Sequence, residues 1–308
     1  MPTARESLAD AVVVGGGPAG LVAAIYLARF RRSVVLVDAG QSRIEKIPRS
    51  HNYPGFAEGV PGAEVRDMLR DQLRSYPVRI VHGFVESAAR APDGFRLDTR
   101  AGPIEGRRML LATGVTDIPP AMPQVRDALD AGVLRYCPVC DAYEVIGKAV
   151  GVYANGPAGV AEALYLRHFS ADITLFMAQG SPGLPAQDRR KLAEAGIRWN
   201  DAPVDAMHRT GERIEVTHAG ARTLCDTLYC ALGVTVHSKL AEALGASVDE
   251  KGYVGIDGHH ATNVPGLYAA GDVSSGLNQI VVAMGGAAIA ASAIHRELGP
   301  AWPARTDA

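Results

Sequence analysis

The residues best suited to carry chemistry are Cys137 and Cys140, which are separated by Pro138 and Val139 and followed directly by Asp141. A Cys-x-x-Cys pair is either a thiol–disulfide couple or half of a metal site. No second Cys-x-x-Cys or His-x-x-His supplies the other half, so we predict a redox couple and no metal site. At a helix start the partner thiol and the helix N-terminus lower a thiol pKa, and Asp141 can then exchange protons or cap the helix.

A glycine-rich turn far upstream of the cysteines has the surroundings of a nucleotide site. An apolar run at 11–14 leads into the turn at 15–20, a helix-forming segment covers 21–29, and a second apolar run at 34–38 ends in an acid. This order predicts a strand, a helix and a second strand in one β-α-β unit.

Each marker of this turn has a physical role in holding a dinucleotide. Gly15 allows the tight turn, Gly17 lets the backbone approach a pyrophosphate, and Gly20 lets the helix pack on the sheet. The phosphates then meet unpaired N–H groups at the positive end of the helix. Asp38 is placed to bind ribose hydroxyls, so we predict a dinucleotide site here rather than a plain surface turn.

A second pattern of the same kind begins shortly after the cysteines. Apolar runs at 149–153 and 173–176 predict two strands, with a turn at 154–159 and a helix at 160–167 between them. The sequence therefore predicts a second nucleotide-binding fold.

The markers that would hold a ligand are missing from this second pattern. Ala154 replaces the first glycine, and Met177 stands at the offset that Asp38 has in the first pattern. Residues 177–185 contain no Arg, Lys or His for a 2′-phosphate. Occupancy by a nicotinamide cofactor and a duplicated domain that has lost its ligand therefore both stay open.

Composition excludes several classes of function. The chain has 308 residues, enough for two domains, with 47% hydrophobic and 21% charged residues and a net charge of −2, so nothing favours nucleic acid or a membrane surface. The apolar stretch 280–294 is too short to span a bilayer and predicts a closely packed buried helix. Four cysteines argue against a secreted disulfide scaffold and for the cytoplasm, and Cys225 and Cys230, in an expected strand at 223–232, are interpreted as structural.

Taken in order, the motifs of this chain resemble the low-molecular-weight thioredoxin reductases within the flavoprotein disulfide reductases. A dithiol inside the second nucleotide domain, rather than the first, is typical of this branch. The resemblance rests on residues 15–20, His51-Asn52-Tyr53-Pro54-Gly55, residues 111–114, residues 137–141, the second glycine-rich turn, residues 266–272 and Asn278-Gln279.

The resemblance implies an FAD-binding enzyme that passes electrons to a protein disulfide such as that of thioredoxin. Cys140 would face the flavin, Cys137 would attack the substrate disulfide, and Asp141 would act as acid and base. The chain would form a homodimer. The residues implied at FAD are Gly15, Gly17, Pro18, Ala19, Gly20, Asp38, His51, Asn52, Val85, Thr113, Gly114, Gly271, Asp272, Gln279 and Ile280.

Two departures from the family pattern leave the electron donor and the direction of electron flow open. The basic cluster that NADPH-using members carry is replaced by residues 177–180, and Asn278 replaces an Arg. The sequences around His51 and Cys137 also look like the subgroup with fungal dithiol oxidases, which close disulfides and pass electrons to oxygen. Other relatives with degraded nicotinamide sites resemble ferredoxin-dependent reductases, and a non-catalytic flavin-binding module is the remaining alternative.

For the fold, we predict an α/β protein with two Rossmann-like three-layer domains, the second inserted in the first. Residues 1–117 and 238–308 would form the FAD domain, and 118–237 the dithiol domain. Pro119-Pro120 predicts an extended linker at the first crossing.

Overall fold

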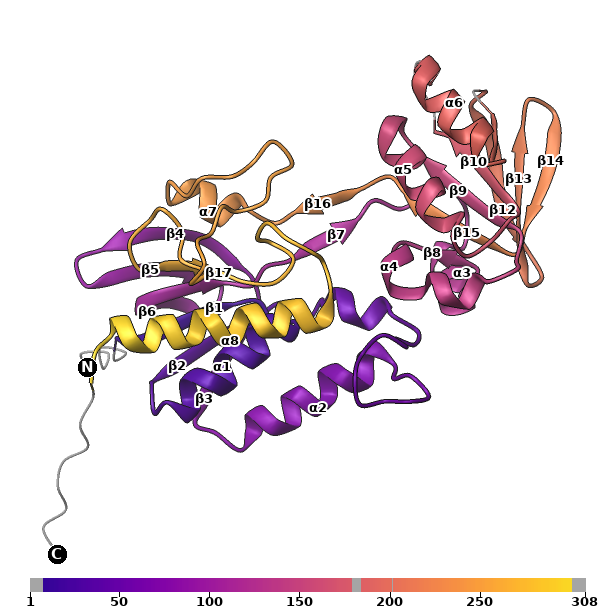
Figure 1. Cartoon of the computed structure of the whole chain (residues 1–308). Coiled ribbons are helices and arrows are strands. Elements are labelled where there is room, and N and C mark those ends of the chain that lie inside the picture. The colour runs from indigo at the N-terminus through magenta and orange to yellow at the C-terminus, as the bar shows by residue number, and fades with distance from the viewer. Residues whose placement is uncertain (1–7, 179–183, 201, 301–308) are drawn as a thin grey trace, which may run out of the picture. The chain divides into compact units, whose positions relative to one another are not determined.

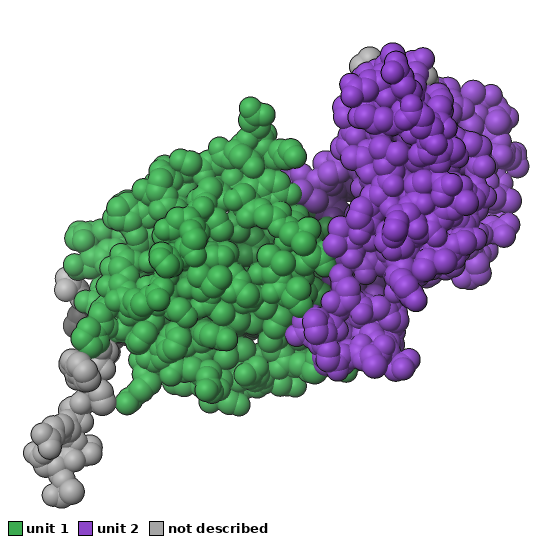
Figure 2. Space-filling view, viewed as in Figure 1, with its two compact units in different colours: residues 1–45, 63–116, 236–308 green, residues 46–62, 117–235 purple. Residues whose placement is uncertain are grey.

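The computed structural model describes residues 8–178, 184–200 and 202–300 (Figure 1). The chain divides into two compact units: unit 1 contains residues 1–45, 63–116 and 236–308, and unit 2 contains 46–62 and 117–235 (Figure 2). The predicted boundaries differ from these by one and two residues. The prediction also placed 46–62 with the FAD domain, whereas this loop clusters with unit 2.

Unit 1 is built on a seven-stranded sheet in the order β3-β2-β1-β6-β5-β4, with β17 paired to β6. The pairs among β1, β2, β3, β6 and β17 are parallel, while β4 and β5 join β6 antiparallel. The strands are β1 (Ala9–Val14), β2 (Val34–Asp38), β3 (Val78–His82), β4 (Val85–Ala91), β5 (Gly94–Thr99), β6 (Gly102–Leu111) and β17 (Leu267–Ala269).

The central strands of unit 1 are buried because helices cover the sheet. β1 and β2 are almost continuous runs of buried Val, Leu and Ala, as expected for parallel strands covered on both faces. α1 packs on β1 and β2 and runs beside α8 (Figure 1). The helices are α1 (Pro18–Arg29), η1 (Arg43–Lys46), α2 (Gly62–Arg74), α7 (Lys239–Ala243) and α8 (Ile280–Glu297).

α8 extends to Glu297, so the expectation that this stretch is too short to span a bilayer is wrong: by length and composition alone it is long and apolar enough to cross a membrane. It packs against α1, and small residues such as Ala287, Ala290 and Ala291 are fully buried. The predicted packed helix is therefore present and continues beyond residue 294. It is buried only on one side, because Val282 and Ile289 are each 44% exposed.

Unit 2 contains a parallel five-stranded sheet in the order β11-β10-β9-β15-β8 and an antiparallel sheet of β12, β13 and β14. Its strands are β8 (Leu134–Arg135), β9 (Val150–Ala154), β10 (Ile173–Met177), β11 (Arg198–Asn200), β12 (Val204–Thr210), β13 (Arg213–His218), β14 (Ala221–Cys225) and β15 (Thr227–Ala231). Its helices are α3 (Val125–Asp130), α4 (Pro138–Asp141), η2 (Ala142–Val145), α5 (Gly156–Leu166) and α6 (Ala186–Glu194). The chain crosses between the units within β7 (Val115–Asp117) and β16 (Val234–Val236), which pair with each other.

The structure corrects the prediction of one strand over 223–232. Two strands in different sheets share this segment, β14 and β15, and they are separated at Asp226. The Asp226 carboxylate accepts a hydrogen bond of 2.9 Å from the backbone N–H of Ala149. A tertiary partner thus stabilises the break in a sequence that reads locally as one strand.

Candidate functional site

The two cysteines form a disulfide at the start of a short helix. Cys137 is the N-cap residue of α4, and its Cα lies 5.3 Å from that of Cys140. Pro138 occupies the first helical position, where its missing N–H costs no helical hydrogen bond. Both cysteines are half-buried, while Val139 between them is exposed. The couple is therefore held in a fixed local frame with access to a partner.

Asp141 lies directly behind the couple, and its carboxylate is held by two donors. The Tyr229 hydroxyl donates to Oδ1 at 2.8 Å, and the Arg135 guanidinium lies 2.8 Å from Oδ2. Burial raises the pKa of Asp141, while Arg135 and Tyr229 act in the opposite direction. Asp141 begins η2 without making a side-chain cap, so the capping interpretation is wrong and the carboxylate faces Tyr229 and Arg135 instead.

Tyr229 and Arg135 were missed by the sequence analysis. Tyr229 is fully buried in β15, where burial and the Asp141 charge raise its pKa above the usual range, so it remains a hydroxyl donor. Arg135, in β8, also donates to the carbonyl oxygens of Gly132 and Asp141. Tyr229 is distant in sequence from the cysteines, and no local spacing marks either residue.

Two further carboxylates lie among these groups. Glu162 is on α5, which packs against α4, and Glu144 is in η2. Each has one buried carboxylate oxygen, Oε1 of Glu162 and Oε2 of Glu144, with no hydrogen-bond partner among the described residues. Burial first, and then the charge of Asp141, raise the pKa of Glu162 to about 7.

The remaining cysteines of unit 2 are unsuited to thiol chemistry. Cys225 and Cys230 are free and buried, and burial raises the pKa of each to about 12. Both fit the interpretation as structural residues, because the thiolate is the reactive form. Within residues 8–178, 184–200 and 202–300, no group of three or more His, Cys, Asp or Glu could hold a metal ion.

The first glycine-rich turn has the geometry of a phosphate cradle. Gly15 has φ +116°, and a Cβ there would lie 2.2 Å from the Ala112 carbonyl oxygen. A Cβ on Gly20 would lie 1.8 Å from the oxygen of Gly15, whereas one on Gly17 would meet only Ser42 Oγ at 3.2 Å. Gly17 precedes α1 without a capping side chain in the described chain, so the residues fit a pyrophosphate at this helix N-terminus.

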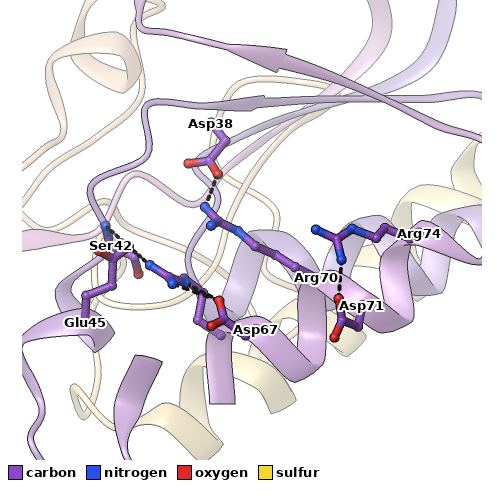
Figure 3. Close-up of polar contacts among 8 residues, drawn as sticks. Asp38, Ser42, Glu45, Asp67, Arg70, Asp71 and Arg74 are labelled. Carbon is purple, nitrogen blue, oxygen red and sulfur yellow. Dashed lines mark hydrogen bonds and ion pairs between the residues drawn. The ribbon is translucent and has the colours of Figure 1, made fainter. Parts of the chain in front are cut away.

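The acid at the end of β2 is buried and already paired. Asp38 Oδ2 lies 2.7 Å from the Arg70 guanidinium of α2 (Figure 3). Its Oδ1 accepts a hydrogen bond of 2.9 Å from Gly40 N–H. A Cβ on Gly16 would lie 2.1 Å from the Asp38 carboxyl carbon. The carboxylate therefore lies against the turn, where a ribose would be expected, and Arg70 is a neighbour that sequence reasoning missed.

Other predicted FAD residues occupy loop and strand ends of unit 1. Gly271 (φ +76°) and Asp272 follow β17, and Asp272 pairs with Arg43 at 3.0 Å. Thr113 donates to the His237 carbonyl at 2.7 Å. Unit 1 also holds the remainder of the set: Pro18 and Ala19 at the start of α1, Val85 at the start of β4, Gly114 before β7, Gln279 as the N-cap of α8, and Ile280 as its first residue.

His51 and Asn52 differ from the rest of the predicted set because they belong to unit 2. Asn52 Nδ2 donates to the carbonyl oxygen of Val139, inside the Cys-x-x-Cys segment, at 3.3 Å. Residues 51–57 line an open pocket of about 480 Å³. The structure thus brings this loop to the dithiol.

The second glycine-rich turn keeps the fold of the first without its acid. Ala154 ends β9, and a Cβ on Gly159 would lie 2.3 Å from the Ala154 Cβ. Met177, which replaces the acid, is 2% exposed and belongs to the core of unit 2. Residues 179–183 of the predicted marker-free segment lie outside the described residues.

Comparison with known proteins finds relatives over nearly the whole chain. The profile of the family described as pyridine nucleotide-disulphide oxidoreductase matches residues 9–287. The thioredoxin reductase of Bacillus subtilis (strain 168) is 26% identical over 306 residues, covering 94% of this chain and 95% of the relative. Thioredoxin reductase tcpT of Claviceps purpurea (strain 20.1) is 30% identical over 291 residues, covering 89% of each. The crystal structure of HlmI matches with a TM-score of 0.87 and 29% identity, covering 96% of this chain and 94% of that one.

Proposed function

Because the chain belongs to the pyridine nucleotide-disulphide oxidoreductases, in their thioredoxin reductase-like branch, we propose that it is an FAD-dependent thiol–disulfide oxidoreductase that reduces a protein disulfide. The observation that carries this proposal is the half-buried Cys137–Cys140 disulfide at the start of α4, with Asp141 fixed behind it. A thioredoxin-like protein is the proposed partner.

FAD would be held by unit 1. The backbone at Gly17 and the N-terminus of α1 would bind its pyrophosphate, and Asp38 would accept the ribose hydroxyls beside Arg70. When bound, FAD supplies a carrier that exchanges two electrons with a disulfide. The steric fit of the turn and the buried acid beside it support this assignment.

The residues of unit 2 would carry out the exchange with substrate. Reduced Cys137 attacks one sulfur of the substrate disulfide and releases the other as a thiolate. The Cys140 thiolate then attacks Cys137, which closes the Cys137–Cys140 disulfide and releases the second substrate sulfur. Asp141 moves a proton between the cysteines and the departing sulfur, with Tyr229 and Arg135 fixing its orientation.

A second candidate is a dithiol oxidase that runs the same exchange in reverse on a small molecule or peptide, with O₂ as the final acceptor. The observation that favours it is Met177, buried at 2% exposure where a nicotinamide ribose would need a polar group. If the protein is a dithiol oxidase, the electrons come from the substrate dithiol. A ferredoxin-fed reductase is compatible with the same observation.

Anaerobic mixing of the flavin-loaded protein with single reductants separates these candidates. Prompt bleaching of the flavin by NADPH, NADH or reduced ferredoxin supports a reductase and identifies its donor. Bleaching by dithiols alone supports the oxidase, provided that exposure to O₂ restores the flavin colour and produces peroxide. A colourless protein that refuses added FAD contradicts both.

The roles of the two cysteines are tested by single substitutions. Cys137→Ser is expected to leave a Cys140 thiolate beside the flavin, seen as a long-wavelength absorption band. Cys230→Ser is the matched control, because Cys230 is buried with a pKa of about 12. A band in Cys140→Ser instead would reverse the assignment.

The proposal includes a cytoplasmic homodimer. The family membership and the exposed Val282 and Ile289 of α8, each 44% exposed, support association of two copies. Sedimentation of the flavin-loaded protein at micromolar concentration measures the oligomeric state.

A further inference from the structure

The carboxylate next to the cysteines is poorly arranged to hold a proton by itself. Both oxygens of Asp141 accept from donors, the Tyr229 hydroxyl and the Arg135 guanidinium, each at 2.8 Å. A proton on Oδ2 would face the guanidinium, which has no lone pair to accept it. The arrangement therefore suits an ionised Asp141, although thiol exchange needs a proton donor near the leaving sulfur.

Glu162 has the complementary environment. Its Oε1 is buried without a hydrogen-bond partner in the described chain, so ionisation would place a charge on an unsatisfied atom. α5, which carries Glu162, packs against α4, which carries Asp141. The groups around the site are Asp141 and Glu144 from α4 and η2, Tyr229 and Cys230 from β15, and Arg135 from β8.

The charges of these groups favour one proton held on the carboxyl groups of the site. Tyr229 and Cys230 stay neutral because burial raises the pKa of each, and Arg135 is paired with Asp141. Asp141 and Glu162 remain as neighbouring carboxyl groups, and the charge of Asp141 disfavours ionisation of Glu162. Burial and the Asp141 charge raise the pKa of Glu162 to about 7, so it exchanges its proton near neutral pH.

We propose that Glu162 is the proton reservoir of the Cys137–Cys140 couple and acts through Asp141. This inference rests on the proposed thiol–disulfide function and holds for either direction of electron flow. In the reducing direction the enzyme dithiol and a substrate disulfide give the enzyme disulfide and two substrate thiols. The protons that leave the cysteines are held by the carboxyl pair and passed to the departing sulfurs, so electrons and protons balance without a further reactant.

The test compares the flavin-loaded wild type with Glu162→Gln. Each enzyme is reduced with one equivalent of dithionite and mixed from pH 5 to 9 with bis(2-hydroxyethyl) disulfide, whose alkyl thiol leaving group needs a proton in this range. The rate of disulfide reduction is followed. The wild-type rate should fall on passing about pH 7. Glu162→Gln should lose that inflection and be about 10- to 100-fold slower below it. Glu194→Gln, at the exposed end of α6, is the matched control and should leave the profile unchanged.

An unchanged inflection in Glu162→Gln, with wild type active, overturns the reservoir while leaving the proposed function intact. Failure of reduced wild type to react with any disulfide removes the proposed function itself. If Glu162→Gln does not fold, infrared difference spectra of the wild-type holoenzyme decide. A protonated-carboxyl band that titrates near pH 7 supports the reservoir, and its absence from pH 5 to 9 overturns it.

Discussion

The two glycine-rich turns have the same place in their units but are constrained by different neighbours. In unit 1, Gly15 has φ +116° and its Cα faces the Ala112 carbonyl so closely that no side chain fits. In unit 2, Ala154 occupies the equivalent position, and its Cβ fills the space above Gly159. The first turn lies directly against the backbone that follows β6 and leaves no room for a side chain, whereas the second turn is packed with a methyl group.

The two units also differ at the end of the second strand of each β-α-β pattern, which is β2 in unit 1 and β10 in unit 2. Asp38 closes β2 as a buried carboxylate paired with Arg70 and Gly40, while Met177 closes β10 as part of the hydrophobic core. The half-buried acids of unit 2 instead lie around the helix of the disulfide: Asp141 and Glu144 follow Cys140 in the chain, and Glu162 is on α5, which packs against α4. The comparison teaches that a Rossmann-like unit can keep its fold while its polar groups serve a different site.

The largest effect is expected from Gly15→Ala. Its Cβ would collide with the Ala112 carbonyl, so we expect loss of flavin binding and a loss of unfolding free energy of about 3 kcal/mol or more. Gly156→Ala is the control in the second turn, since its Cβ meets nothing within 4 Å and only φ +56° opposes it, at about 1–2 kcal/mol. Flavin content and urea unfolding measure both, and equal losses would abolish the contrast.

Met177→Asp tests whether an acid at the end of β10 is all that unit 2 lacks for binding a nicotinamide cofactor. The carboxylate would enter the hydrophobic core without the two donors that Asp38 has, so we expect destabilisation of about 2–4 kcal/mol and no gain of NADH oxidation. Met177→Leu should cost less than about 1.5 kcal/mol. A stable Asp variant that oxidises NADH would show that one residue removed the nicotinamide site.

Glu162→Gln should stabilise the protein at alkaline pH. The pKa of Glu162 is raised in the folded state from 4.5 to about 7, so the folded form binds the proton more tightly than the unfolded chain. The stability that this proton gives is complete below about pH 4.5 and lost as pH rises through about 7. The variant should match wild type at about pH 4 and exceed it at about pH 8 by on the order of 3 kcal/mol. Thermal unfolding at both pH values measures this, and a pH-independent difference would contradict it.

Asp38→Asn should have the smallest effect. It removes the charge that faces Arg70 and the acceptor proposed for the ribose, so FAD affinity should fall about 5- to 10-fold, or about 1 kcal/mol. Asp67→Asn, on the same surface but with a side chain 59% exposed, should leave the affinity unchanged. Fluorescence titration of the flavin-free proteins with FAD measures the affinity of each variant. An unaltered FAD affinity in Asp38→Asn would contradict the proposal that Asp38 binds the ribose.

Local sequence patterns predicted much of the secondary structure around the site. The second strand of unit 1 begins at Val34 and ends at Asp38, as its apolar run indicates, and the Cys-x-x-Cys pair lies at a helix start as expected. Prediction was weaker at 223–232, where two strands are separated at Asp226, whose carboxylate accepts a hydrogen bond from the backbone N–H of Ala149. The pattern of apolar and polar residues indicates local secondary structure. It cannot indicate a hydrogen-bond partner that is distant in the sequence.

The sequence by itself determined the order of the two β-α-β units, the disulfide couple and the missing acid at Met177, because these depend on residue type and spacing. Only the tertiary structure decided that Asp141 is held by Tyr229 and Arg135, that Arg70 pairs with Asp38, and that the loop at 46–62 joins unit 2. The physical reason is that burial and charge pairing are properties of neighbours in space. Glu162 is an ordinary helix residue in the sequence, and its proton affinity arises from the burial and the carboxylate that folding brings to it.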